Sequence, residues 1–279
     1  MNLKKWSIPR ATSFYRLNNM SLLEIKKVTK DFGGLEALSK VSMHIKEGDI
    51  ISLIGPNGAG KTTLFNCITG TMPPSSGTIK FMGRELVGLR PHEVARQGIA
   101  RTFQHIRLFN RMTVLDNVMV GTDYKGRTGI FSALLRPPRV GREEKASKKK
   151  CHEVLSLFGE RLLPRMAQSA DMLSYANRRR LEIARALVAE PRLILLDEPT
   201  AGMNPHETQG IVDLIHLIRE QGHTVLVIEH KMKVVMSISD RIVVLDHGEK
   251  IAEGTPDEIA ADKNVIEAYM GGRQRAQTE

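Results

Sequence analysis

The sequence predicts an α/β protein with a mostly parallel core sheet, an N-terminal antiparallel β subdomain and an inserted α-helical subdomain. Short, almost continuous apolar runs alternate with helical segments, which is typical of strands buried on both faces of a parallel sheet. One of these runs, at 50–54, leads directly into a glycine-rich loop and a helix. A more polar, helix-like block at about 105–190 then interrupts the alternation, and we expect it to be the inserted subdomain.

The elements can be assigned in order along the chain. We expect a helix at 61–69 and a short hairpin arm at 78–86. A later helix has a clear start, because Asn204 can cap it, Pro205 fits its first turn and Glu207 can complete a capping box. The strands are expected at 22–32, 41–45, 50–54, 192–198, 224–230 and 241–254.

The 279 residues fit one large domain, or a core with a smaller subdomain. Residues 1–19 are basic and lack a continuous apolar segment, so we expect a disordered leader rather than a secretory signal. The folded domain is predicted to span 20–272, and 273–279 to form a C-terminal tail. No apolar run approaches the roughly 20 residues that are needed to cross a bilayer.

The net charge of +10 at pH 7 is compatible with nucleic acid, or with an anionic ligand or membrane surface, as a partner. Much of the excess falls in the leader, in 125–150 and in the arginines after 177. Aromatic residues make up only 5% of the chain and do not interleave with a basic stripe, which disfavours nucleic acid. Solvated faces and contacts to an anionic ligand or membrane are the favoured interpretation.

The loop GPNGAGKT at 55–62 matches the pattern of loops that bind nucleotide phosphates, and it lies between a strand and a helix. Its glycines let backbone N–H groups converge on phosphate oxygens, and the helix N-terminus favours negative charge. Lys61 is expected to bridge the β- and γ-phosphates, Thr62 to ligate Mg²⁺ and Thr63 to reach the α-phosphate. The predicted phosphate-binding residues are Gly55, Pro56, Asn57, Gly58, Ala59, Gly60, Lys61, Thr62 and Thr63.

Two carboxylates, Asp197 and Glu198, end the apolar run LILLDE. A lone Asp-Glu pair at a strand end is more often a loop start or a helix cap, but a phosphate loop in the same chain favours a catalytic role. A buried strand has little reason to end in two charges unless they meet a cation or a reacting water. Asp197 is therefore expected to hold Mg²⁺ through its water shell, and Glu198 to polarise the attacking water as general base.

His230 ends another apolar run, TVLVIEH. Parallel strands bring their C-terminal ends to one edge of the sheet, so His230 is expected at the same edge as Gly55 and Asp197. That position favours a γ-phosphate contact over a purely structural histidine. Gln104 follows the strand-like segment 98–103 and by itself would be an unremarkable polar residue.

Together these residues resemble the ATP-binding cassette (ABC) family from about residue 20 to the C-terminus, which implies a P-loop NTPase-type ABC nucleotide-binding domain that uses ATP and Mg²⁺. GPNGAGKTT looks like the Walker A motif, LILLDE like Walker B and LSYAN like the signature loop. The resemblance places Gln104 at the Q-loop, as a catalytic and Mg²⁺-binding residue, and His230 at the switch histidine. Phe32 matches the aromatic residue that stacks on adenine, although a core phenylalanine is an equally good interpretation.

A narrower resemblance is to the ATPase of branched-chain amino-acid uptake systems. It is carried by RTFQHIRLFNRMTVLDNV (101–118), EPTAGMNPHET (198–208) and GTPDEIAADKNVIEAYMGG (254–272). It implies a partner ATPase of similar sequence, membrane permease subunits and, indirectly, an extracytoplasmic solute-binding protein. The chain would then be a peripheral protein on the cytoplasmic face of the inner (plasma) membrane. Amide and urea importers share much of the pattern and stay an alternative.

The resemblance also implies that the signature loop serves the nucleotide held by a partner subunit. Ser174, Ala176 and Asn177 are the expected contacts, and Ser174 can also cap the following helix. Ala176 replaces a glycine that is usual in the subfamily; the methyl group costs roughly 1–2 kcal/mol if φ is positive and is harmless if φ is negative with no close atom. We therefore expect a functional but weakened loop, and a rise in ATPase activity in Ala176→Gly.

The leading hypothesis is an ATP-hydrolysing, energy-coupling subunit of an ABC importer whose Gln104 region and inserted subdomain contact the permease. A soluble ABC ATPase acting on nucleic acid or ribosomes is a second hypothesis. Such proteins usually carry two cassettes in one chain or a long coiled-coil insertion, and neither is present. A third is an inactive subunit whose partner alone hydrolyses ATP. Because the importer hypothesis is favoured over the second one, nucleic acid is not among the expected partners.

Overall fold

The computed structural model describes residues 21–122 and 138–275. The predicted leader at 1–19 lies outside them. The last helix continues to Arg275, past the predicted end of the domain at residue 272, and the rest of the predicted tail, 276–279, is also outside the described residues. The boundaries of the predicted domains stay a prediction.

The large sheet is mostly parallel, as predicted. Its strand order is β10-β9-β3-β8-β7-β6, and only the β9–β10 pair is antiparallel. Every residue of the three central strands β3, β7 and β8 is buried, which explains their continuous apolar sequences. The strands are β3 (Ile50–Ile54), β6 (Ile99–Arg101), β7 (Leu193–Asp197), β8 (Thr224–Ile228), β9 (Arg241–Asp246) and β10 (Glu249–Gly254).

The predicted antiparallel subdomain is a second sheet near the N-terminus, with strand order β2-β1-β4-β5. Its second strand begins at Leu35 rather than at the predicted residue 41, because pairing with the first strand continues almost to the connecting turn. The strands are β1 (Leu23–Phe32), β2 (Leu35–Ile45), β4 (Ser76–Phe81) and β5 (Arg84–Glu85). Apolar side chains from this sheet, from the large sheet and from the first helix share one core cluster.

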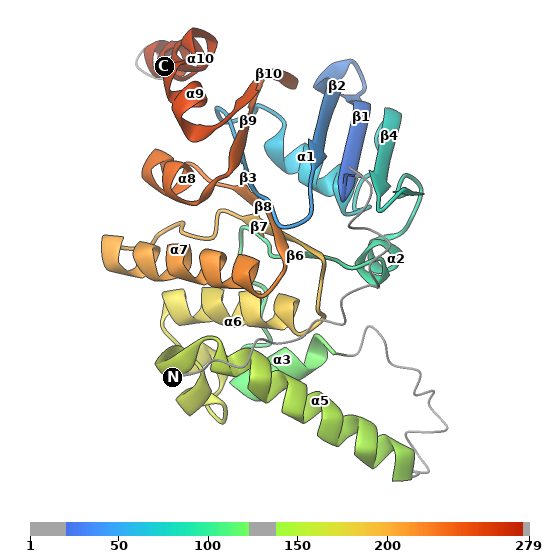
Figure 1. Cartoon of the computed structure of the whole chain (residues 1–279), viewed down its shortest axis with the longest axis vertical. Helices are drawn as coiled ribbons and strands as arrows, with labels where there is room; N and C mark the ends of the chain where they lie inside the picture. Colours follow the sequence, from blue (N-terminus) through green and yellow to red (C-terminus); the bar gives the residue numbers. More distant parts are fainter. Residues whose placement is uncertain (1–20, 123–137, 276–279) are drawn as a thin grey trace.

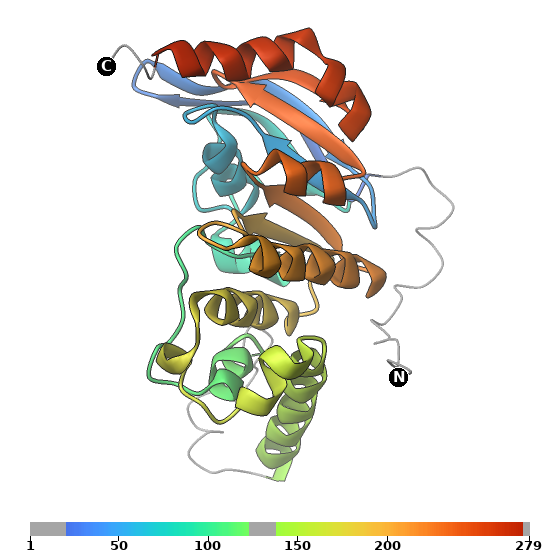
Figure 2. The ribbon, with the colours of Figure 1, turned by 90° about the vertical axis from the view of Figure 1, so that its left-hand side faces the viewer.

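Helices α3, α5 and α6 gather at the end of the molecule opposite the small sheet, and α6 lies next to α7 (Figures 1 and 2). They all fall within the predicted helical block. Leu181, Ala184 and Leu187 of α6 and Val188 at its end are fully buried in one core cluster with side chains of α3 and α5. The α-helices are α1 (Lys61–Ile68), α2 (Pro91–Arg96), α3 (Val114–Val120), α5 (Pro138–Ser156), α6 (Tyr175–Leu187), α7 (Pro205–Glu220), α8 (Met232–Ile238), α9 (Pro256–Ala261) and α10 (Lys263–Arg275); three short 3₁₀ turns, η3 (Gly159–Arg161), η4 (Leu163–Arg165) and η5 (Ala170–Met172), precede α6.

The predicted start of α7 is confirmed. The Asn204 side chain accepts a hydrogen bond from the N–H of Glu207, and the Glu207 carboxylate accepts one from the N–H of Asn204. This capping box fixes where the chain turns after β7.

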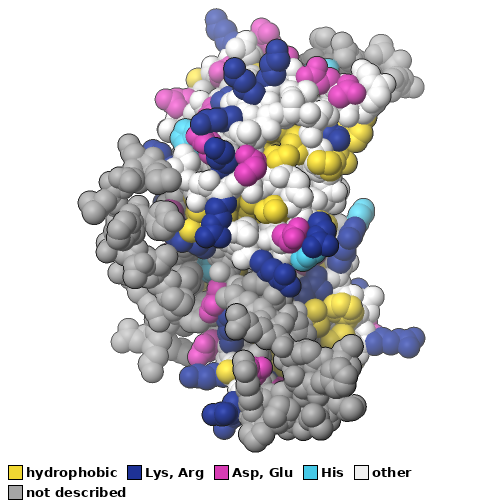
Figure 3. Space-filling view, turned by 90° about the vertical axis from the view of Figure 1, so that its right-hand side faces the viewer, with side chains coloured by type: hydrophobic (Ala, Val, Ile, Leu, Met, Phe, Trp, Pro, Cys, Tyr) yellow, Lys and Arg dark blue, Asp and Glu magenta, His cyan; other side chains and the backbone are white. Residues whose placement is uncertain are grey.

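The surface is mixed in charge on the face shown in Figure 3, where Lys and Arg side chains are interspersed with acidic ones over the height of the molecule. Among the helices of the described residues, none combines the length and the apolarity that a membrane span requires.

Candidate nucleotide-binding and catalytic site

The phosphate loop joins β3 to α1 and is shaped by two close backbone approaches. At Gly55, where φ is 148°, a Cβ would lie 2.0 Å from the carbonyl oxygen of Leu245. At Gly60, where φ is 96°, it would lie 2.5 Å from the carbonyl oxygen of Ala37. Only glycine fits both positions, so the loop is held between β9 and β2.

Lys61 begins α1 and is only 6% exposed. Its ammonium donates hydrogen bonds to the carbonyl oxygens of Gly55 and Pro56, both at 2.8 Å, and so lies inside the curl of the loop. Burial lowers the pKa of Lys61, while the negative charges of Glu198 and Asp197 act in the opposite direction. These two carboxylates and the phosphate loop therefore form one electrostatic site.

Asp197, at the end of β7, is held by an arginine that the sequence did not single out. The Oδ2 atom of Asp197 accepts a hydrogen bond from Nη2 of Arg101 at 2.9 Å, and the two side chains are only 4% and 8% exposed. Arg101 lies on β6, the neighbouring strand, and also donates to Asn66 of α1 at 2.7 Å. The one signal in the sequence is a basic residue at the end of a strand-like segment, and its partner is visible only once β6 and β7 are paired.

The three predicted catalytic side chains meet at one point. The Oε1 atom of Glu198 lies 2.9 Å from Nε2 of His230 and accepts a hydrogen bond from Nε2 of Gln104 at 3.4 Å. The three residues follow β7, β8 and β6, which are neighbours in the large sheet. The Glu198 side chain is 21% exposed, so water can reach its carboxylate.

The residues predicted to bind Mg²⁺ all carry oxygen donors of the kind this ion prefers: the hydroxyl of Thr62, the amide oxygen of Gln104 and the carboxylate of Asp197. Thr62 and Gln104 are exposed, whereas Asp197 is buried. Mg²⁺ commonly binds one or two carboxylates together with water and substrate phosphates, and this donor set fits that pattern.

The signature loop forms the N-terminus of α6. The hydroxyl of Ser174 accepts a hydrogen bond from the N–H of Asn177, as an N-cap does. Ala176 lies within α6, is 2% exposed, and is not one of the non-glycine residues with positive φ. The strain that motivated the expectation of a weakened loop is therefore absent at this position.

In the signature loop, the ring of Tyr175 lies beside Gly202, where an added Cβ would be 3.6 Å from it. Phe32, at the end of β1, is 46% exposed and packs against the ammonium of Lys30, 5.1 Å from the ring centroid. An exposed ring is free to stack on a ligand, which disfavours the interpretation as a core phenylalanine.

Helix α6 holds the backbone of the Q-loop around Gln104 through two buried charged residues, Arg179 and Glu182, which the sequence did not single out. Arg179 donates to the carbonyl oxygens of Phe103 and Gln104 at 2.5 and 2.6 Å and pairs with Glu182 at 2.8 Å. Glu182 in turn accepts from the N–H groups of Phe103 and Arg107, both at 3.4 Å. Gln104 is therefore tied to the helix that begins with the signature loop.

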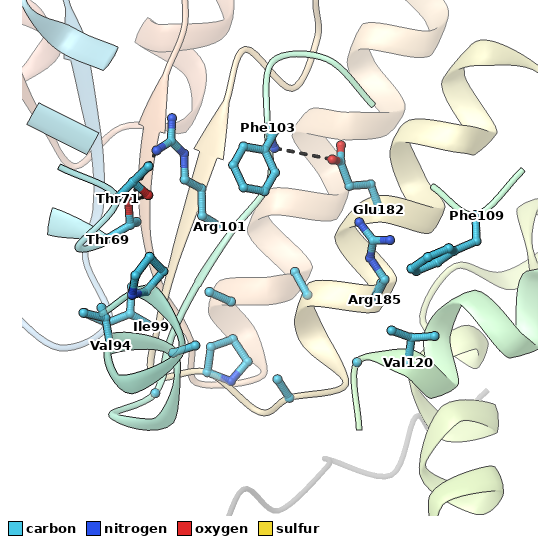
Figure 4. Close-up of a pocket in the computed structure, with 18 residues that line it drawn as sticks. Thr69, Thr71, Val94, Ile99, Arg101, Phe103, Phe109, Val120, Glu182 and Arg185 are labelled. Carbon is cyan, nitrogen blue, oxygen red and sulfur yellow. Dashed lines mark hydrogen bonds between the residues drawn. The ribbon is translucent and has the colours of Figure 1, made fainter. Parts of the chain in front are cut away.

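A pocket of about 480 Å³ lies beside these contacts and is lined in part by Phe103 and Glu182 (Figure 4). Val94 of α2 and Ile99 of β6 line one side, and Phe109, Val120 and Arg185 line the other. Figure 4 shows Phe109 beside Arg185, with Val120 close by. Phe109 and Val120 are 49% and 37% exposed, so the pocket offers apolar surface at the junction between the large sheet and the helical block.

Comparisons with protein-family models match residues 38–201 to the ABC transporter family and residues 249–274 to the branched-chain amino acid ATP-binding cassette transporter family. The high-affinity branched-chain amino acid transport ATP-binding protein LivG of Salmonella typhimurium is 46% identical over 251 residues, covering 90% of this chain and 98% of that protein. Its counterpart BraF of Pseudomonas aeruginosa is 44% identical with the same coverage. The probable LivG of Archaeoglobus fulgidus is 33% identical, covering 91% of this chain and 97% of its own length.

Comparisons with solved structures also find ATP-binding cassettes. The ADP conformation of an ATP-binding cassette of an ABC transporter superposes with a TM-score of 0.79 at 32% identity, covering 90% of this chain and 99% of that one. A dimeric ATP-binding cassette in a post-hydrolysis state, bound to ADP and Pi, gives a TM-score of 0.68 at 28% identity, covering 84% and 98%. By its fold, its motifs and these similarities, the chain belongs to the ABC transporter family and, within it, to the branched-chain amino acid transport ATP-binding proteins.

Proposed function

We propose that this chain hydrolyses ATP as the energy-coupling subunit of an ABC importer for branched-chain amino acids. The observation that carries the proposal is the contact of Glu198 with both Gln104 and His230, in the electrostatic site that contains Lys61. The similarity to the LivG and BraF proteins supports the class of solute.

In this proposal the glycine loop and Lys61 bind the β- and γ-phosphates, and Thr63 binds the α-phosphate. Phe32 stacks on the adenine. Thr62, Gln104 and Asp197 would hold Mg²⁺, and the ion would neutralise part of the phosphate charge. Arg101 holds the Asp197 carboxylate in place through its hydrogen bond to Oδ2.

Glu198 accepts the proton of a water molecule as the water oxygen attacks the γ-phosphorus. The bond from that phosphorus to the bridging oxygen of ADP breaks, and ADP and phosphate are the products. Gln104 orients the water, and His230 contacts the γ-phosphate while its hydrogen bond to Glu198 fixes the carboxylate.

The signature loop contributes to a second site across a dimer. We assign the hydroxyl of Ser174 and the backbone of Ala176 and Asn177 to the nucleotide of a partner ATPase, because the N-terminus of α6 can bind negative charge. The dimeric post-hydrolysis neighbour supports an assembly of this kind.

The transmembrane permease is the second partner. We assign its contact to the pocket beside the Q-loop, because an exposed apolar surface there is joined to Gln104 through α6. This arrangement implies a peripheral position on the cytoplasmic face of the inner membrane and an indirect link to an extracytoplasmic solute-binding protein.

The proposal is tested with Glu198→Gln in the assembled complex. Removing the proton acceptor while keeping the shape should lower the kcat for ATP about 10²–10⁴-fold and let an ATP-bound dimer accumulate. Glu220→Gln, at the exposed C-terminal end of α7, is the control and should turn over normally. Wild-type complex that neither binds ATP nor responds to branched-chain amino acids presented by its binding protein would refute the proposal; stimulation by an amide or urea instead would overturn only the solute.

A further inference from the structure

The loop between Glu198 and α7, residues 200–203, is joined to the segment that carries His230 by a buried carboxylate. Glu229 is only 3% exposed. One of its oxygens accepts hydrogen bonds from the N–H of Thr200, at 3.0 Å, and from the Thr200 hydroxyl. Its other oxygen accepts from the N–H groups of His230 and Lys231, at 2.9 and 3.2 Å.

Lys231, which follows His230 in the chain, joins the same two segments. Its ammonium donates to the carbonyl oxygens of Thr200 and Met203, at 2.9 and 3.1 Å, and to the hydroxyl of Thr208 at 3.1 Å. An ammonium has three N–H donors, so three oxygens saturate it. All three acceptors belong to the 200–203 loop or to the first turn of α7.

The backbone just before the 200–203 loop is strained at one residue. Glu198 is a non-glycine residue with φ of 46°, whereas Gly202, inside the loop, adopts its φ of 69° without strain because it has no Cβ. A left-handed conformation is costly for a residue with a Cβ and persists only where the surroundings hold it. The bonds from Glu229 and Lys231 lie on this stretch, immediately after the carboxylate that contacts His230 at 2.9 Å.

We propose that Glu229 and Lys231 are positioning residues. Their hydrogen bonds, called the clasp below, hold the 200–203 loop against the segment that carries His230 and thereby fix Glu198 against His230. The inference rests on the proposed ATP hydrolysis and deepens it. The two charges that flank His230 in the chain set the geometry of the hydrolytic step, whereas most of the proposed phosphate contacts come from the separate loop around Lys61. The clasp is therefore expected to act on kcat and not on the affinity for ATP.

The test compares Lys231→Met with Lys233→Met in the assembled complex. Both variants remove one lysine charge and keep most of the stem, but Lys233 is exposed on α8. In Lys231→Met the kcat should fall about tenfold or more, with a KM for ATP within about twofold of wild type, and an ATP-bound dimer should accumulate. Lys233→Met should match wild type in all three measurements.

Thr208→Val is a milder second variant, because it removes one acceptor of the ammonium without leaving a buried charge alone. It should lower kcat by a few-fold at unchanged KM, and Lys231→Arg should recover part of the activity that Lys231→Met loses.

An unchanged kcat in Lys231→Met and Thr208→Val would overturn the clasp. Equal losses of ATP affinity and kcat would do so too, because they would show a general structural role. Either result leaves wild-type ATPase activity intact, whereas a wild-type complex without ATPase activity would refute the proposed function itself.

Discussion

At the scale of single residues, Arg101 shows how the site is held in a buried environment. Its guanidinium lies over the rings of Phe65 and Phe103, 5.5 and 5.3 Å from their centroids, and pairs with Asp197. A carboxylate at the end of a buried strand requires a counter-charge, and this one is supplied from the neighbouring strand. The same guanidinium bonds to Asn66 on α1, so one side chain links the Walker B strand to the helix of the phosphate loop.

Arg101→Met should therefore lower the free energy of unfolding by about 3–5 kcal/mol, because Asp197 is left buried without its partner. The double variant Arg101→Met with Asp197→Asn should recover most of the loss. Urea denaturation of the purified chain measures both. Arg84→Met, which removes an exposed arginine, serves as the control. If the double variant were as unstable as the single one, the loss would come from packing and not from the unpaired carboxylate.

At the scale of elements, α6 connects two functions. Its N-terminus is the signature loop, and its third turn carries Glu182, which with Arg179 holds the backbone around Gln104. We therefore expect a movement of the Q-loop to be transmitted to the signature loop. This connection depends on the buried ion pair of Arg179 and Glu182. Removing either residue would leave the other charge buried without its partner and would lower the stability of the fold.

The helical geometry reverses the expected effect of Ala176→Gly. Because Ala176 already has helical geometry and a buried methyl group, glycine relieves no strain and weakens the first turn. The variant should lose about 1 kcal/mol of stability in denaturation experiments and show no rise in ATPase activity in the assembled complex. A clear rise in turnover would instead support the weakened loop that the sequence alone had led us to expect.

At the scale of the whole molecule, the junction between the large sheet and the helical block is where a partner can reach the catalytic centre. The pocket there is lined by Phe103 and Arg101, which adjoin Gln104 and Asp197 respectively. A partner seated in the pocket would touch the residues that hold Gln104 and Asp197.

Phe109→Asp places a charge on the exposed apolar rim of this pocket. It should weaken association with the permease by about 2 kcal/mol or more, measured by co-purification, while ATP binding by the isolated chain is retained. Ile266→Asp is the matched control, because Ile266 is similarly exposed, at 44%, on α10. Normal co-purification of Phe109→Asp would place the permease contact elsewhere.

Much of the site could be predicted from the sequence because its residues follow local patterns. The glycine loop before Lys61 and the capping box from Asn204 to Glu207 are both set by neighbouring residues, and the capping box is confirmed. One topological rule, that parallel strands end at the same edge, placed His230 beside Gly55 and Asp197, whereas Gln104 was placed only by the family resemblance. The roles of these residues stay a prediction.

Arg101, Arg179 and Lys231 could not be assigned, because an arginine or lysine in a sequence looks the same whether it is solvated or paired. Their partners lie 96, 75 and 31 residues away in the chain, at Asp197, Gln104 and Thr200. The sequence by itself determined the family, the fold class and the phosphate loop, because those depend on short-range patterns of glycine and apolar residues. Only the tertiary structure decided which charges are buried together and whether Ala176 is strained, because burial and backbone conformation arise when distant segments pack against each other.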